Sequence, residues 1–250
     1  MTKYLLGAVV VAIVLSLAVG MGSTQVPNTF ENLQVLPKDI SKGELMGVMR
    51  EMTGALGVRC NHCHVPGDNP NSLEGFDFAS DEVDKKGIAR EMMRMTQAIN
   101  ATYMPKAKES PLRVQCVTCH HGVAVPAQLK DVLWDAAEAD GLKGVDAKYR
   151  ELRERYYGSF AYDFSPGPLN ALAEEMAEEG ELQPAIGVMD LNLEFHPDNA
   201  YSYLLKGQIQ AEAGDKSGAI ASVKKALDLE PDNDWAKRLL ERIQGMEDPK

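Results

Sequence analysis

Apolar residues recur along most of this chain at intervals of three and four residues, which is the period of an amphipathic helix. No βαβ pattern is visible among them. Residues 131–164 are charged and helix-prone, and we expect one helix there, followed by a Gly/Pro-rich linker that extends to Pro168. The pattern as a whole predicts an all-α chain.

Two of the predicted helices are rich in methionine. The first begins at Ser41, which forms with Glu44 the Ser-x-x-Glu pattern of a capping box, and its methionines recur every third residue near one face. The second extends from Ile88 to Ile99 and is again apolar at helical spacing. The methionines are Met46, Met49 and Met52 in the first segment and Met92, Met93 and Met95 in the second.

A period of 34 residues appears in the last third of the chain. In its second copy, small residues and a terminal proline occupy the positions typical of tetratricopeptide repeats. We therefore expect two such repeats over residues 166–233 and a capping helix from Asp234 to about Met246. Three repeats are normally needed for independent stability, so this module should pack on another module or chain, with a plain helical bundle that binds no ligand as the alternative. The pairs that define the period are Gly180 and Gly214, Ala185 and Ala219, Leu193 and Leu227, and Pro197 and Pro231.

The start of the chain predicts export. Lys3 precedes an apolar run from Tyr4 to Val19, and Ala18-Val19-Gly20 fits cleavage after Gly20. The run is slightly shorter than the ~20 apolar residues that span a bilayer, so an uncleaved membrane anchor over residues 4–20 is the alternative. We expect a periplasmic protein.

The charge balance limits the classes of partner. The chain has 26 basic and 37 acidic residues and a formal net charge of -11. Nucleic-acid binding requires clustered Lys and Arg, so no nucleic-acid partner is expected. A basic protein partner is compatible with this charge.

The cysteines carry the strongest chemical signal. All four belong to a CxxC pair, and a histidine follows each pair directly: Cys60, Cys63 and His64 in one motif, Cys116, Cys119 and His120 in the other. Two thiols one helical turn apart can add to the two vinyl groups of one haem, and the adjacent histidine can reach the iron as proximal ligand. The spacing therefore predicts two covalently bound haem c groups.

Three other interpretations of the cysteines compete with haem attachment. Two disulfides would suit an exported chain, but they do not require a histidine after each pair. A zinc site built from both pairs would leave two histidines surplus and would enclose 52 intervening residues. A thioredoxin-like dithiol would need a single CxxC on a βαβ scaffold.

Methionine is a candidate for the sixth iron ligand at each haem. Its thioether sulfur is a soft ligand that raises the potential of haem iron relative to a second histidine. Methionine also fills irregular gaps, so packing against the porphyrin explains the remaining methionines. The period alone leaves the choice within each helix open, and His62, His121 and His196 are the alternative ligands.

Several segments resemble the cytochrome c subunit of photosynthetic reaction centres. They are residues 35–40, the end of the first methionine-rich helix at 55–60, residues 95–100, and the second motif with its following glycine at 116–122. The resemblance covers roughly residues 30 to 125. It implies haem units built from a helix, a turn and CxxCH, with the helix supplying a methionine ligand, and it points to Met49 for the first haem and Met92 for the second.

The chain also departs from that family. Its photosynthetic members carry four haems, whereas this chain has two attachment motifs. The resemblance places a histidine ligand of the fourth haem after Asn100, where this chain has Tyr103-Met-Pro-Lys106. The resemblance therefore implies a two-haem unit, and docking to a reaction centre does not follow from it.

These observations predict four parts: a signal peptide or anchor over 1–20, a dihaem cytochrome domain over 21–130, a helical linker over 131–165, and two repeats with a cap over 166–250. The expected function is electron transfer between a donor and an acceptor protein, with a further protein partner on the repeats and no substrate turnover. The alternatives are a dihaem peroxidase, which needs an open sixth position, and a repeat scaffold that recruits a redox partner.

Overall fold

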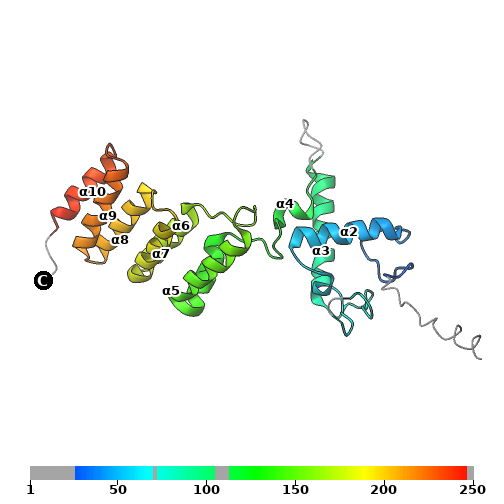
Figure 1. The fold of residues 1–250 in the computed structure, drawn as a ribbon. Coiled ribbons are helices and arrows are strands. Elements are labelled where there is room, and N and C mark those ends of the chain that lie inside the picture. The colour runs from blue at the N-terminus through cyan, green and yellow to red at the C-terminus, as the bar shows by residue number, and fades with distance from the viewer. Residues whose placement is uncertain (1–25, 70–71, 105–112, 247–250) are drawn as a thin grey trace, which may run out of the picture. The chain divides into compact units, whose positions relative to one another are not determined.

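A computed structural model describes residues 26–69, 72–104 and 113–246. Within these ranges the chain forms α-helices, one short 3-10 helix and an isolated bridge between Val65 and Asp77 (Figure 1), which confirms the all-α prediction. The predicted signal peptide or anchor over residues 1–20 lies outside the described residues. Among the residues that are described, no helix is long and apolar enough to cross a membrane. The chain divides into two units, up to Thr118 and from Cys119 onward.

Unit 1 contains the two methionine-rich helices, α2 (Lys42–Leu56) and α3 (Asp84–Thr102). The predicted capping box opens α2: the Ser41 hydroxyl accepts from the Glu44 amide at 3.3 Å, and the Glu44 carboxylate accepts from the Ser41 amide at 3.0 Å. The helix ends at Gly57, whose φ of 66° is left-handed and favours glycine. Both helices therefore form where the sequence predicts them.

Unit 1 has almost no apolar core of its own. Leu45 and Ala55, both on α2, are its only buried apolar residues among those described. The 19 residues of α3 contain no buried side chain. A module of this size normally needs a larger core, a metal or another covalent constraint to be stable.

The first long helix of unit 2 is α5 (Leu129–Tyr156). The sequence predicts one helix in this region, but the backbone leaves the helical conformation at Asp140 and Gly141, where Gly141 has φ 57° and ψ -150°. A Cβ atom on Gly144 would collide with the carbonyl oxygen of Ala136, so glycine there lets the two halves of α5 approach closely. The expected single helix is therefore two helical segments joined by a glycine turn.

The 34-residue period is visible in the helix boundaries of unit 2. The helices are α6 (Pro166–Glu178), α7 (Leu182–Phe195), α8 (Ala200–Glu212), α9 (Lys216–Leu229) and α10 (Asp234–Gln244). The starts of α8 and α9 follow those of α6 and α7 by one period, and α10 begins one period after α8. The helix boundaries agree with two two-helix units followed by one further helix (Figure 1).

Close packing between the repeat helices depends on a glycine and on buried polar contacts. A Cβ atom on Gly207 would lie 2.7 Å from a methyl group of Val223, so glycine allows α8 and α9 to pack tightly. The side-chain amide of Asn192 donates to Asn170 Oδ1 at 2.7 Å, and the Ser202 hydroxyl donates to the same oxygen at 2.8 Å. These bonds join α6, α7 and α8 across the repeat boundary.

The helical linker predicted over 131–165 shares a core with the repeats. One cluster of buried residues joins α5 to α6, α7 and α8, and a smaller cluster joins α8, α9 and α10. The most deeply buried large residues of the first cluster are Leu133, Val145, Tyr149, Leu169, Leu172, Val188 and Met189. Two repeats are thus stabilised by packing against α5 on one side and by the cap on the other.

Candidate haem-attachment sites

The first CxxCH motif forms one helical turn. The 3-10 helix η1 covers Cys60–His62, and the His64 amide donates to the Cys60 carbonyl oxygen at 3.0 Å. This turn places the two cysteines three residues apart on a helical arc and brings His64 directly after them, as haem attachment requires. His62, one of the alternative ligands, lies within the same turn and is half-buried.

A loop that follows the motif folds back over the His64 imidazole. The Asp77 amide donates to the Val65 carbonyl oxygen at 3.0 Å and forms the isolated bridge. The Phe78 ring then meets the His64 ring edge-on, with 5.1 Å between the ring centroids, and Phe76 stacks on Phe78 at 5.5 Å. The aromatic pair therefore fixes one side of the histidine ring.

The His64 imidazole is held by packing more than by hydrogen bonding. Its Nδ1 atom is buried and has no hydrogen-bond partner among the described residues. Burial lowers the pKa of His64, and the nearby Lys86 cation lowers it further. The ring is therefore neutral at pH 7, which is the form that can ligate a metal.

The second CxxCH motif forms the short helix α4 (Cys116–His120). His120 Nδ1 lies 2.9 Å from the Val123 carbonyl oxygen. A carbonyl can only accept, so Nδ1 carries the proton and Nε2 keeps the free lone pair that an iron ligand needs. The turn is possible because His121 and Gly122 adopt φ 47° and 91°, which returns Val123 to the histidine. His121 is exposed in this turn.

Asn100, near the end of α3, anchors the segment that leads into the second motif. Its side-chain amide donates to the Val114 carbonyl oxygen at 2.8 Å, and the Val114 amide donates to Asn100 Oδ1 at 2.8 Å. This pair of bonds reproduces the pairing of two extended backbones. It fixes the approach to Cys116 relative to the helix that carries Met92.

The chemistry of the thiols bears on the competing interpretations. All four cysteines are free, so neither CxxC pair is a disulfide here. No group of three or more His, Cys, Asp or Glu residues that could hold a metal occurs within the described ranges. Burial raises the pKa of Cys63 and of Cys116, whereas a reactive dithiol requires a lowered thiol pKa. None of the three observations supports the disulfide, zinc or thioredoxin interpretation.

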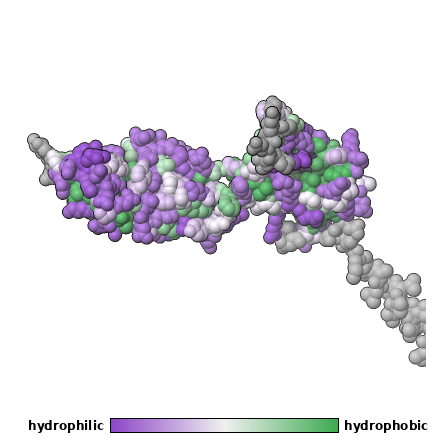
Figure 2. Space-filling model, turned by 90° about the horizontal axis from the view of Figure 1, so that it is seen from above, coloured by the Kyte–Doolittle hydropathy of each residue, from purple (hydrophilic) through white to green (hydrophobic). Residues whose placement is uncertain are grey.

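An apolar stripe on α3 is uncovered in this structure. Ile88, Met92, Met95 and Ile99 follow one another at spacings of four, three and four residues and so share one helix face. Ile88, Met92 and Met95 are 52%, 39% and 45% exposed. Figure 2 shows apolar surface on unit 1 among polar side chains. A flat apolar group such as a porphyrin would cover a stripe of this kind, so the residues present fit the haem groups that the motifs predict.

The methionines differ in exposure between the two helices. Met46, Met49 and Met52 on α2 are all half-buried, so burial does not distinguish Met49 from its neighbours. On α3, Met92 lies on the exposed stripe together with Met95, while Met93 is half-buried on another face. The choice of Met49 and Met92 therefore stays a prediction.

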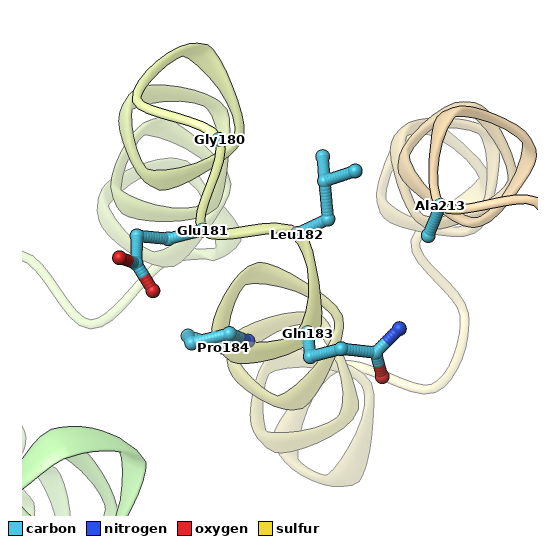
Figure 3. A pocket seen from close by; sticks show the side chains of 6 residues that line it. All are labelled: Gly180, Glu181, Leu182, Gln183, Pro184 and Ala213. Atoms are coloured by element: carbon cyan, nitrogen blue, oxygen red, sulfur yellow. The ribbon is translucent and has the colours of Figure 1, made fainter.

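Unit 2 contains a shallow depression at the turn between α6 and α7 (Figure 3). It is lined by Gly180, Glu181, Leu182, Gln183, Pro184 and Ala213. Glu181 is its only ionisable residue, and Figure 3 shows its side chain directed away from Ala213. The depression therefore lacks the donor set of a metal or catalytic site.

His196, the last of the alternative iron ligands, lies directly after α7, where burial lowers its pKa.

The model of the photosynthetic reaction centre cytochrome c subunit family matches residues 10–174. The chain belongs to this family. The match includes both CxxCH motifs, both methionine-rich helices and the whole of α5. Most of the repeat module lies beyond it.

Among characterised relatives, the chain is 36% identical over 99 residues to the photosynthetic reaction center cytochrome c subunit of Thermochromatium tepidum, which is 39% of this chain and 22% of that one. It is 38% identical to cytochrome c-554 of Chloroflexus aurantiacus over 99 residues, which cover 39% of this chain and 21% of that one. It is 32% identical to the photosynthetic reaction center cytochrome c subunit of Roseobacter denitrificans over 111 residues, which cover 43% of this chain and 28% of that one. The chain therefore spans less than a third of the length of each of these relatives.

A solved structure of the Arabidopsis OM64 TPR domain is also similar to the chain. The TM-score is 0.33 and the sequence identity 21%, over 47% of this chain and 93% of that one. The repeat organisation of unit 2 rests on its own helix boundaries and their 34-residue offsets.

Four residues of the two sites were not predicted from the sequence. They are Phe78 and Lys86 beside His64, Asn100 beside the second motif, and Val123, whose carbonyl accepts from His120. Gly122, two residues after His120, is a sequence signal for the left-handed turn that presents Val123. Phe78 and Lys86 lie outside any motif, and only the folded loop brings them to His64.

Proposed function

We propose that this chain is an exported two-haem c-type cytochrome that transfers electrons between redox proteins. The observation that carries the proposal is that each CxxCH motif forms a helical turn with its histidine held in place, in a chain whose α3 exposes a stripe of apolar residues. The bound haem would supply one-electron chemistry by cycling its iron between the ferrous and ferric states. Family membership supports electron carriage over substrate turnover.

The protein residues would hold the cofactors and control their surroundings. Cys60 and Cys63 would form the two thioether bonds of the first site, and Cys116 and Cys119 those of the second. His64 and His120 would ligate the two irons through Nε2, the second with its tautomer set by the Val123 carbonyl. The stripe on α3 would exclude water from one haem face, which affects potential and solvent access.

Export and protein partners complete the proposal. The apolar run over residues 4–20 supports translocation to the periplasm, where c-type haems are attached, with the uncleaved segment as a membrane anchor in the alternative form. A donor protein and an acceptor protein are required by electron transfer.

The repeat module would offer a surface to a protein partner. Tyr201 on α8 and Trp235 on α10 lie one 34-residue period apart, and their side chains are 47% and 39% exposed. The two rings stack with 6.3 Å between their centroids.

The haem content tests the proposal directly. After periplasmic expression with the haem-maturation proteins, we expect the purified chain to carry two haems by pyridine haemochrome assay and by intact mass, and to lack residues 1–20 if the signal is cleaved. A colourless protein would refute the proposal. A ferric spectrum that is high-spin and responds promptly to cyanide would instead favour the peroxidase, because that enzyme keeps an open sixth position.

The proposed methionine ligands can be tested separately. Replacing Met49 or Met92 by alanine should leave both haems attached, because the thioether bonds remain, but should lower one midpoint potential or make one haem high-spin, because the thioether ligand is lost. Spectroelectrochemical titration measures both effects. Met46→Ala and Met93→Ala are the matched controls on the same helices and should change neither. If Met52→Ala or Met95→Ala gave the large effect instead, the assignment within that helix would be wrong.

A further inference from the structure

Lys86 on α3 is a partly buried cation that organises the loop beside the first motif. Its ammonium group donates to three consecutive carbonyl oxygens, those of Phe78 and Ala79 at 2.9 Å and that of Ser80 at 2.7 Å. Only 12% of its side chain is exposed. A lysine with three carbonyl acceptors keeps its charge while it is shielded from water, so its field extends into the protein with less screening than that of a surface lysine.

Asp81, at the end of this loop, is the carboxylate that forms an ion pair with Lys86. Asp81 lies 3.2 Å from the Lys86 ammonium and 3.0 Å from the Arg90 guanidinium, whose side chain is also 12% exposed. Hydrogen bonds from Arg90 and Asn32 hold the pKa of Asp81 well below its usual range, so the carboxylate is ionised. We call Lys86, Arg90 and Asp81 the Lys86 cluster. A second carboxylate, Asp77, also lies within electrostatic reach of Lys86 and His64, and its pKa is lowered chiefly by hydrogen bonds from the backbone of Ser80 and Ala79.

The Lys86 cluster lies beside the first motif. Lys86 binds the carbonyl group of Phe78, the residue whose ring contacts His64. After burial, Lys86 has the largest effect in lowering the pKa of His64, and Arg90 acts in the same direction. The Phe78 backbone and the Asp77 carboxylate raise that pKa, but the effect of Asp77 is smaller than that of either cation, so the charges around His64 act on balance as a positive field. Beside His120, by contrast, the contact to Nδ1 is the neutral carbonyl of Val123.

From this asymmetry we propose that the Lys86 cluster makes the haem at Cys60 and Cys63 the one with the higher reduction potential, so that the haem at Cys116 and Cys119 donates its electron to the first. The inference rests on the proposed function, since it requires that both haems are attached. It makes Lys86 a positioning residue, because it acts on the first haem through the loop and through its charge and does not ligate the iron.

Two physical effects give the direction. Oxidation adds one positive charge to the haem, so a nearby cation disfavours the ferric state and raises the potential. A hydrogen bond from Nδ1 to a carbonyl makes the imidazole a stronger donor to the metal, which favours the ferric state and lowers the potential. His120 has that bond at 2.9 Å, whereas His64 Nδ1 makes no hydrogen bond of normal geometry among the described residues, although the Phe78 backbone lies close enough to act on the ring. The charge effect therefore sets the direction, and the difference in hydrogen bonding acts in the same sense.

Opposite charge changes in one cluster provide the test. In redox titrations of the two-haem protein, Lys86→Gln should lower the upper midpoint potential, and Asp81→Asn should raise it. For Lys86→Gln we expect the electron-exchange equilibrium between the haems to change by about tenfold, which corresponds to ~59 mV for a one-electron couple. The same shifts should appear in the background Cys116→Ala/Cys119→Ala, where the first haem alone is titrated. Lys86→Arg should restore the wild-type potential.

The matched control is Lys148→Gln, which makes the same charge change on α5, at a lysine that pairs with Glu151, and should move neither potential. A loosened loop would shift the potential in the same direction in both Lys86→Gln and Asp81→Asn, so shifts of equal sign, or none, would overturn the proposal. Loss of the first haem in both variants would show that the cluster serves attachment instead, and would overturn it as well. Haems are counted first, so that a chain without haem contradicts the proposed function and is not mistaken for a failure of this inference.

Discussion

Replacing both Cys60 and Cys63 by alanine is expected to leave the purified protein with one covalently bound haem in place of two. The thiols of this pair lie within one helical turn and are free, so under the proposed function they would provide the covalent attachment at the first site. His64 would remain, but coordination by a single imidazole does not survive the denaturing conditions in which intact mass is measured. Intact mass and the pyridine haemochrome assay should therefore both report half of the wild-type haem content.

Two matched variants complete this test. Cys116→Ala/Cys119→Ala should also leave one haem, and the remaining haem in each double variant should belong to the other motif. Asn61→Ala lies between the first two cysteines, is exposed, and should keep both haems. Two covalent haems in either double-cysteine variant would show that the CxxCH pairs are not the attachment sites.

The second large effect is expected in unit 2, where Tyr149→Ala should destabilise the fold by about 3–5 kcal/mol, the usual cost of truncating a buried aromatic residue. The Tyr149 ring is fully buried, meets Phe164 edge-on at 5.8 Å and lies 5.2 Å from Phe195. It thus joins α5, the α5–α6 connection and α7 at one point. Urea unfolding followed by circular dichroism should show a lower midpoint for the transition of this unit.

Tyr149→Phe separates packing from the hydroxyl group. The Arg153 guanidinium donates to the Tyr149 hydroxyl at 3.5 Å, a long bond that contributes little, so this variant should lose less than ~1 kcal/mol. A loss in Tyr149→Phe as large as that in Tyr149→Ala would show that the hydroxyl, and not the ring, stabilises the core.

The two units are therefore stabilised by different means. Unit 2 buries a continuous set of side chains from α5 to α10, as a helical repeat array does. Unit 1 buries only two apolar residues among those described and leaves apolar side chains of α3 exposed. Under the proposed function, the haem groups would supply the missing apolar contacts of unit 1. Cofactor attachment and folding of that unit would then depend on one another.

Local patterns in the sequence were sufficient for the helices and for the attachment motifs. The Ser41 and Glu44 capping box predicts the start of α2 because its two hydrogen bonds join residues only three apart. The 34-residue period predicts the boundaries of α6 to α10 because each repeat makes the same contacts with its neighbour. The CxxCH spacing is likewise local, and each motif forms a helical turn.

Contacts between residues distant in sequence were decided by the tertiary structure. The glycine turn within α5 depends on the close approach of Gly144 to Ala136, which the helix-prone composition does not reveal. Lys86 and Phe78 reach His64 only because the loop folds back across the bridge from Val65 to Asp77. The sequence by itself determined where the helices lie and where the two CxxCH motifs stand, from which two haem sites are predicted. Only the fold decided that a shielded cation lies beside one histidine and a carbonyl oxygen beside the other, because electrostatic surroundings depend on distance in space and not on spacing along the chain.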